Sequence, residues 1–210
     1  MSCARISSVV ALSLLGAIAV PASASMTSIE GNLALSTEGL ADFTGFLDYQ
    51  FLGGNQGQLT VTLTNTTDPS KGGYLTAFMF RTPASFGAFT SNLVSSTYAG
   101  MTNIPAGSSG SPFPGAWLGG AGLGASWLSG GSPNDGVASG STGQWVFSIT
   151  GVMASALDAV NFVDGDAYAF IVRFRGLDDD CSDKVPASTP APGALVLGAT
   201  GLAFSRRRRN

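Results

Sequence analysis

Apolar and polar side chains alternate strictly along the segment from Gln58 to Thr64. Leu59, Val61 and Leu63 are separated by threonines, and polar residues also stand at both ends. A repeat of two residues places the apolar side chains on one face of an extended strand and the threonines, which are good strand formers, on the other. Such a strand must bury one face of a sheet, so this segment predicts β-structure.

Neighbouring segments extend this strand into an antiparallel sheet. The glycine-rich turn Gly53–Gly57 joins it to Phe43–Leu52 in a hairpin. Residues Tyr74–Arg81 are apolar on both faces, which is typical of a strand between two layers. Further strands are expected at Ile29–Ser36, Ala88–Val94, Gln144–Thr150 and Tyr168–Phe174, and a short helix at Val152–Ala159. We therefore predict an all-β fold, an antiparallel β-sandwich of jelly-roll-like or Ig-like type with one short helix.

The composition excludes several classes of function. The chain of 210 residues has no histidine, which excludes Ser-His-Asp and Cys-His catalysis. Two cysteines are too few for a disulfide scaffold, and there is no His/Cys cluster for zinc. No spacing of Asp and Glu residues singles out a catalytic pair. We expect a protein that is not an enzyme, with a secreted hydrolase that uses acidic residues as the weaker alternative.

The N-terminus has the three regions of a secretory signal peptide. Arg5 gives a positive start, an apolar run extends from Val9 to Val20, and Ala22 and Ala24 form a small-residue cleavage site. A buried core helix is the alternative for the apolar run, but the order of the three regions favours a signal helix. We predict cleavage after Ala24, so that residues 1–24 are a signal peptide.

The C-terminus shows a comparable arrangement in reverse. An extended stretch with Pro190, Ala191 and Pro192 precedes an apolar run from Ala194 to Phe204. The chain then ends in a basic cluster made of Arg206, Arg207, Arg208 and Arg209. A helix over the apolar run reaches about 18 Å, which is short of the roughly 30 Å hydrocarbon core of a bilayer. The arginines favour a cytoplasmic position for the end of this apolar helix.

This tail resembles the PEP-CTERM sorting signal of bacterial exosortase substrates, in which a Pro-Glu-Pro motif precedes an apolar helix and a basic cluster. Residues 190–192 match it as a Pro-Ala-Pro variant, with Ala191 in place of Glu. The resemblance implies transient anchoring in the inner membrane of a Gram-negative-type bacterium, and processing near the proline motif by an exosortase-type enzyme. It also implies a place at the cell surface or in the matrix, with exopolysaccharide or biofilm. A permanent weak membrane anchor is the alternative.

Residues 25–185 form the predicted body, between the signal peptide and a sorting tail at 186–210. Five of the ten basic residues, Arg5 and Arg206–Arg209, lie in the two ends, whereas all 13 acidic residues lie in the body. The body therefore has 5 basic and 13 acidic residues and a formal charge of −8. Such a surface is unsuited to nucleic acid or to anionic lipid.

The character of the chain changes between residues 105 and 143, where 12 of 39 residues are glycine. A long loop in a compact domain is usually functional or disordered. Trp117 and Trp127 interrupt the stretch, and two roles are open for them. They could stack on sugar rings, which would make the body a carbohydrate-binding module. Alternatively, and favoured here because tryptophan is mostly buried, they anchor the loop on the body.

Acidic residues near the end of the body suggest one metal site. The carboxylates of Asp178, Asp179, Asp180 and Asp183 are the kind of ligand that calcium prefers. No EF-hand spacing is present, so a solvated loop is the favoured interpretation and no cofactor is expected. Cys181 is the cysteine that remains after signal cleavage, and it could be a free thiol or pair between chains. The sequence thus predicts an exported surface or matrix protein of unassigned molecular activity.

Overall fold

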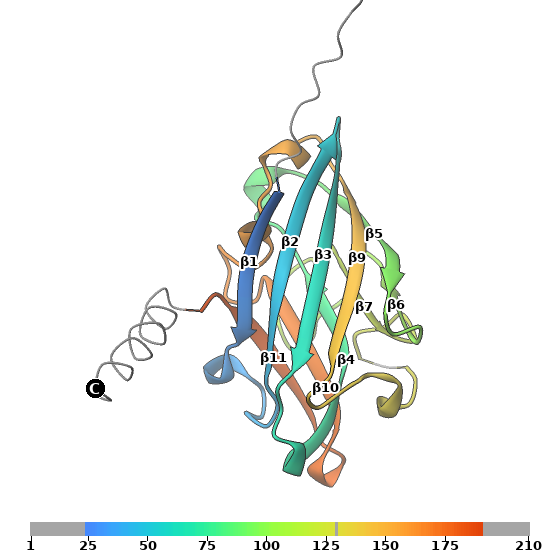
Figure 1. The fold of residues 1–210 in the computed structure, drawn as a ribbon. Coiled ribbons are helices and arrows are strands. Elements are labelled where there is room, and N and C mark those ends of the chain that lie inside the picture. Colours follow the sequence, from blue (N-terminus) through green and yellow to red (C-terminus); the bar gives the residue numbers. More distant parts are fainter. Residues whose placement is uncertain (1–23, 129, 191–210) are drawn as a thin grey trace, which may run out of the picture.

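The computed structural model describes residues 24–128 and 130–190. Predictions that concern Ala22, Ala191, Pro192 and Arg206–Arg209, and with them both terminal helices, lie outside the described residues. The described part is mostly β, and its eleven strands form one antiparallel sheet that folds back on itself in two layers (Figure 1). The predicted all-β, antiparallel class is confirmed.

The first layer has the strand order β5-β9-β3-β2-β1 and the second has the order β11-β10-β4-β7-β6, with β8 beside β4. The bounds in the first layer are β1 Ala24–Gly31, β2 Phe43–Gly53, β3 Gln56–Asn65, β5 Thr90–Ser96 and β9 Thr142–Thr150. In the second layer they are β4 Gly72–Phe80, β6 Met101–Ile104, β7 Gly119–Leu123, β8 Val137–Ala138, β10 Phe170–Leu177 and β11 Ser182–Ser188.

The two layers meet at both sides, which makes the fold nearly barrel-like. On one side β1 pairs with β11 through Glu30 and Gly31. On the other side β5 and β6 follow each other in the chain, and the Leu93 amide donates to the side-chain oxygen of Asn103 at 2.9 Å. Closure of this kind leaves little exposed strand edge.

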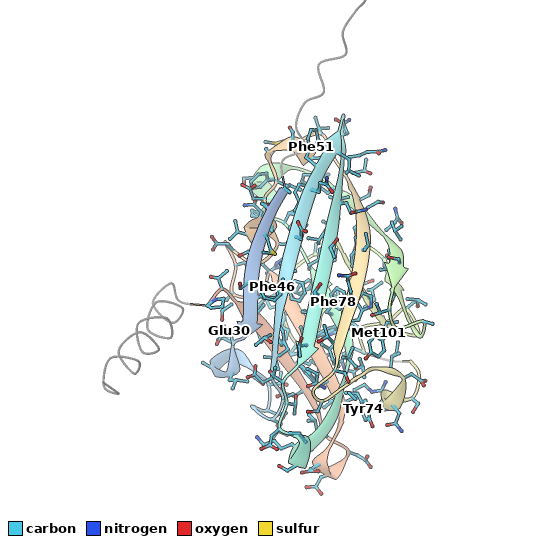
Figure 2. The ribbon with its side chains drawn as sticks, viewed as in Figure 1. Glu30, Phe46, Phe51, Tyr74, Phe78 and Met101 are labelled. Carbon is cyan, nitrogen blue, oxygen red and sulfur yellow. The ribbon has the colours of Figure 1, made fainter. Side chains whose placement is uncertain are left out.

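The predicted hairpin and the alternation in its second strand are confirmed. β2 and β3 pair with Leu47 opposite Val61, and all three alternating apolar side chains of β3 are fully buried. They contribute to a core rich in aromatic rings, where Phe78 packs edge-on against Trp145 and Phe147. Figure 2 shows Phe78 between the layers and Phe46 on the outer face of β2, where it is exposed.

β4 is buried on both faces, as its sequence predicts. Phe78 and Phe80 point into the main core, whereas Ala77 and Met79 belong to a second apolar cluster on the other side of the layer. Strict alternation would place Leu75 on the same face as Ala77 and Met79, but Leu75 shares the main core with Phe78. The register between β4 and β10 shifts by one residue at Thr76, and such a bulge moves the preceding side chains to the opposite face.

Other local predictions were also wrong. The segment 152–159 forms no α-helix. It contains one short 3-10 helix, Ala154–Ala156, and the first residue of a second, Ala159–Phe162. The Ala154 carbonyl accepts the Tyr49 hydroxyl at 2.7 Å, and Asp158 caps the second helix, so tertiary contacts divide a segment too short to sustain a helix. The first strand covers Ala24–Gly31 and ends before most of the predicted Ile29–Ser36.

A buried carboxylate fixes the connection between β1 and β2. Asp183 lies on β11 and is fully buried. One carboxylate oxygen accepts the hydroxyls of Ser36 at 2.6 Å and Thr37 at 3.0 Å, together with the amides of Glu38 and Lys184. The other accepts the amides of residues 40 and 41 at 2.8 and 3.0 Å. Five donors of the 36–41 segment are thereby satisfied by one charge.

Replacing Asp183 by Asn should destabilise the fold strongly. The amide group of Asn would present N–H donors to other N–H donors, and each buried donor left without a partner costs about 1–3 kcal/mol. We expect Asp183→Asn to lower the free energy of unfolding, measured by urea denaturation, by about 3 kcal/mol or more. The matched control is Asp180→Asn at an exposed position, which should stay within about 0.5 kcal/mol. Equal effects of the two substitutions would contradict this role.

The same carboxylate should make stability depend on acid pH. Burial by itself raises the pKa of Asp183, but hydrogen bonds from the Ser36 hydroxyl and from amides of the 36–41 segment outweigh burial and hold the pKa below its ordinary value. Because the folded-state pKa is lowered, the stabilisation is complete above the unfolded value and is lost as the pH falls through the folded value. Urea titrations at decreasing pH should show this loss in the parent chain and a smaller one in Asp183→Asn.

Candidate functional site

The glycine-rich stretch of residues 105–143 covers the outer face of the second layer. Phe113, Trp117 and Trp127 pack in the second apolar cluster with Met79 and Ile171, and both tryptophans are only 2% exposed. The Trp127 indole donates to the Ser111 carbonyl at 2.9 Å. In this arrangement neither indole offers a face to a sugar ring, and both anchor the stretch on the sheet.

The prediction of one long loop over residues 105–143 was wrong, because the stretch contains β7 and β8. Gly122 of β7 lies opposite Ala77 of β4, and Gly119–Leu123 is buried throughout. Glycine is a poor strand former, so no local pattern reveals β7. Packing against β4, which needs a small residue at close approach, overrides that weak preference.

Three arginines hold this stretch by its backbone. Arg81 donates to the Pro114 carbonyl at 3.0 Å, Arg173 to the Trp127 carbonyl at 2.8 Å, and Arg175 to the Gly130 carbonyl at 2.6 Å. Burial, and then the charge of Arg175, lower the pKa of Arg173 to about 10. An irregular segment leaves carbonyl groups without strand partners, and the arginines of the body satisfy them.

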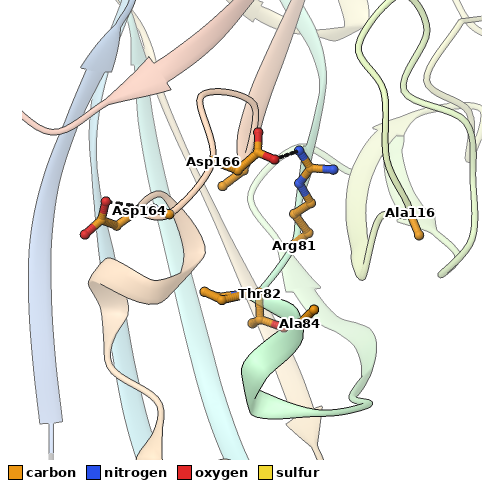
Figure 3. Close-up of a pocket in the computed structure, with 9 residues that line it drawn as sticks. Arg81, Thr82, Ala84, Ala116, Asp164 and Asp166 are labelled. Atoms are coloured by element: carbon orange, nitrogen blue, oxygen red, sulfur yellow. Dashed lines mark hydrogen bonds and ion pairs between the residues drawn. The ribbon is translucent and has the colours of Figure 1, made fainter.

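A cleft lies where Arg81 leaves the end of β4. It has a volume of about 360 Å³ and is lined by Arg81, Thr82, Asp164 and Asp166, with small apolar residues around them (Figure 3). An Arg81 side-chain nitrogen lies 2.6 Å from a carboxylate oxygen of Asp166. The Arg81 guanidinium also lies over the Trp117 ring, 5.1 Å from its centre. Charged, polar and apolar groups therefore meet in one concave site.

Gly115 allows Arg81 to take this position. Its φ is +122°, a backbone conformation that residues other than glycine rarely adopt. A Cβ at residue 115 would overlap the Arg81 guanidinium. The glycine is therefore required both by the backbone and by the close approach of the arginine.

The loop that carries Asp164 and Asp166 separates this cleft from a second depression of about 350 Å³. Asn32, Ser188 and Thr189 line the second depression together with residues 163–167. The Asp164 carboxylate accepts the Gly165 amide at 2.7 Å, and the Asp166 carboxylate accepts the Tyr168 amide at 2.8 Å. These bonds give the loop its shape and leave its acidic groups exposed on the surface.

The predicted calcium ligands do not converge. Asp178, Asp179 and Asp180 are exposed on one 3-10 turn, whereas Asp183 is buried and its oxygens face the 36–41 segment. Within residues 24–128 and 130–190, no three His, Cys, Asp or Glu side chains are placed to hold a metal ion. Cys181 is exposed as a free thiol.

The remaining predicted site residues are Ala24, at the first position of β1, and Pro190, which follows β11. Pro190 lines an apolar groove of about 310 Å³ with Ile29 and Phe46. In the described part of the chain no helix is both long and apolar enough to cross a bilayer.

Comparison of the chain with protein-family models, with curated proteins and with solved structures finds no match. The candidate site therefore depends on geometry alone.

Sequence reasoning did not identify Arg81 as part of a site, because it reads as the last residue of a strand. Asp164 and Asp166 read only as turn residues. A usable signal is the scarcity of basic residues in the body, where five stand against 13 acidic ones. Three of those five satisfy carbonyls of the glycine-rich stretch.

Trp127→Ala should act on stability, because its indole is an anchor. Truncating a large buried side chain costs about 3–5 kcal/mol, and we expect a loss of that size in the free energy of unfolding measured by urea denaturation. Leu128→Ala is the matched control, since that neighbouring side chain is 49% exposed. Its effect should remain within about 0.5 kcal/mol. A stable Trp127→Ala protein would argue against the anchoring role.

Proposed function

We propose that this chain is an exported bacterial surface or extracellular-matrix protein, sorted by a C-terminal exosortase-type signal and associated with exopolysaccharide. The observation that carries the proposal is the order of Pro190-Ala191-Pro192, an apolar run and Arg206–Arg209 at one end, with a signal-peptide pattern at the other. In this proposal the body is a β-sandwich of jelly-roll-like or Ig-like type and has no catalytic activity.

The positions at which the first and last strands begin and end support this proposal. Cleavage after Ala24 would leave Ser25, whose hydroxyl accepts the Ala159 amide at 2.7 Å, at the start of β1. Processing near residues 190–192 would leave β11, which ends at Ser188, paired with both β10 and β1. Removal of both ends is therefore compatible with every described strand pairing apart from that of Ala24 with Gln50.

The targeting mechanism follows from charge and hydropathy. The signal peptide starts translocation, and the apolar tail then halts in the inner membrane. Arg206–Arg209 hold the tail there, because a cluster of positive charge is retained on the cytoplasmic side. An apolar segment too short to span comfortably suits a transient anchor, from which an exosortase-type enzyme releases the body.

The alternative of a carbohydrate-binding module that uses Trp117 and Trp127 loses support, because both rings are buried. A secreted hydrolase is favoured by no observation in the described residues.

Intact-mass analysis of the protein recovered from its host tests the sorting proposal. We expect an N-terminus at Ser25 and a C-terminus close to Pro190–Pro192. Replacing Arg206–Arg209 by Gln should abolish C-terminal processing, because the tail is no longer retained. The matched control replaces the same four residues by Lys, which keeps the charge and should be processed. A C-terminus at Asn210 in the parent protein would overturn the processing proposal.

A further inference from the structure

We propose that the Arg81 cleft, with the second depression across the Asp164–Asp166 loop, binds uncharged sugar units of a polysaccharide. This inference deepens the proposed association with exopolysaccharide and rests on that proposed function. It places the contact at a site that contains neither buried tryptophan.

Arg81 is held in one position before any ligand arrives. The Pro114 carbonyl, the Asp166 carboxylate and the Trp117 ring all contact its guanidinium. A guanidinium has five N–H groups, and these hydrogen bonds involve one on each terminal nitrogen. The side chain remains 15% exposed, at the cleft that it lines. A preorganised donor of this kind avoids the entropy cost of ordering a long side chain on binding.

The lining favours a ligand with hydroxyl groups. Arg81 supplies donors, the carboxylates of Asp164 and Asp166 supply acceptors, and the Thr82 hydroxyl can do either. A sugar hydroxyl both donates and accepts, so it can connect these groups. Two carboxylates beside one arginine oppose an anionic ligand, whereas the arginine opposes a cationic one. An uncharged polyol fits the mixed set best.

The size and apolar part of the cleft suit a small ring. Its volume of about 360 Å³ lies at the lower end of ligand sites. Pro83, Ala84, Ala116 and Ala169 provide small apolar surfaces beside the polar groups. Figure 3 shows Ala116 on the opposite side of Arg81 from Asp166, where its small side chain lines the cleft.

The second depression indicates a polymer in place of a single sugar. It has nearly the same volume and shares the Asp164–Asp166 loop as its wall. Its other lining residues are uncharged, with polar groups from Asn32, Ser188 and Thr189 beside the apolar side chains of residues 163, 167 and 187. Two depressions on either side of one polar loop can take neighbouring sugar units of one polysaccharide, with the exposed carboxylates of the loop between them.

Affinity electrophoresis of the full chain tests the proposal. Native gels contain dextran, hydroxyethyl cellulose or galactomannan as neutral probes, or alginate as an anionic probe. Ala116→Trp places a large side chain in the cleft and breaks no hydrogen bond. Asp164→Ala removes an exposed acceptor together with the bond that it accepts from the Gly165 amide. Asp178→Ala is the matched control at an exposed carboxylate outside the cleft. Urea denaturation of each variant verifies that it is folded.

We expect at least one neutral probe to retard the parent chain, with alginate having less effect. Ala116→Trp should exclude the sugar unit by occupying its space, and Asp164→Ala should remove one or two of its hydrogen bonds, so both variants should bind that probe about tenfold more weakly or worse. Asp178→Ala should bind like the parent. Lack of retardation by all three neutral probes, stronger binding of alginate, or equal binding by the cleft variants would overturn the inference. Sorting is measured separately by the terminal masses, so failure of either proposal can be distinguished.

Discussion

The carboxylate of Asp183 joins the last strand of the body to the connection between its first two strands. Five groups of the 36–41 segment donate to it, and each would be an unsatisfied donor without that charge. Next to this connection, β1 and β11 pair through only two residues of each strand. The closure of the two layers on that side therefore depends on a charged hydrogen-bond network as well as on strand pairing.

On the outer face of the second layer, where a sheet usually meets water, the backbone of the glycine-rich stretch packs against the strands. Trp117 and Trp127 fill the space above Met79 and Ile171, and arginines satisfy the carbonyl groups that such backbone leaves free. Arg81 belongs to both this scaffold and the cleft. The contacts that anchor the stretch therefore also orient the donor that we propose binds sugar, so stability and binding are coupled at one residue.

Much of the sheet could be predicted because its signals are local. The hairpin of β2 and β3, the strand β9 and the two-sided burial of β4 were predicted from periodicity, since successive residues of a strand face opposite sides. β7 and β8 were missed because small side chains carry no such pattern. Alternation alone misplaces Leu75, because one extra residue in a bulge reverses which face the preceding side chains occupy. The cleft was missed because Arg81 and Asp166 lie 85 positions apart.

The sequence by itself determined the antiparallel β class of the body. It also determined that an acidic body lies between two terminal segments that each combine an apolar run with basic residues. Both are sums or repeats of neighbouring residues, which need no long-range information. Only the tertiary structure decided that the tryptophans are buried, that Asp183 accepts donors from residues 36–41, and that Arg81 meets Asp166. These pairings depend on which distant segments the layers bring together, and the energy of a buried charge depends on those partners.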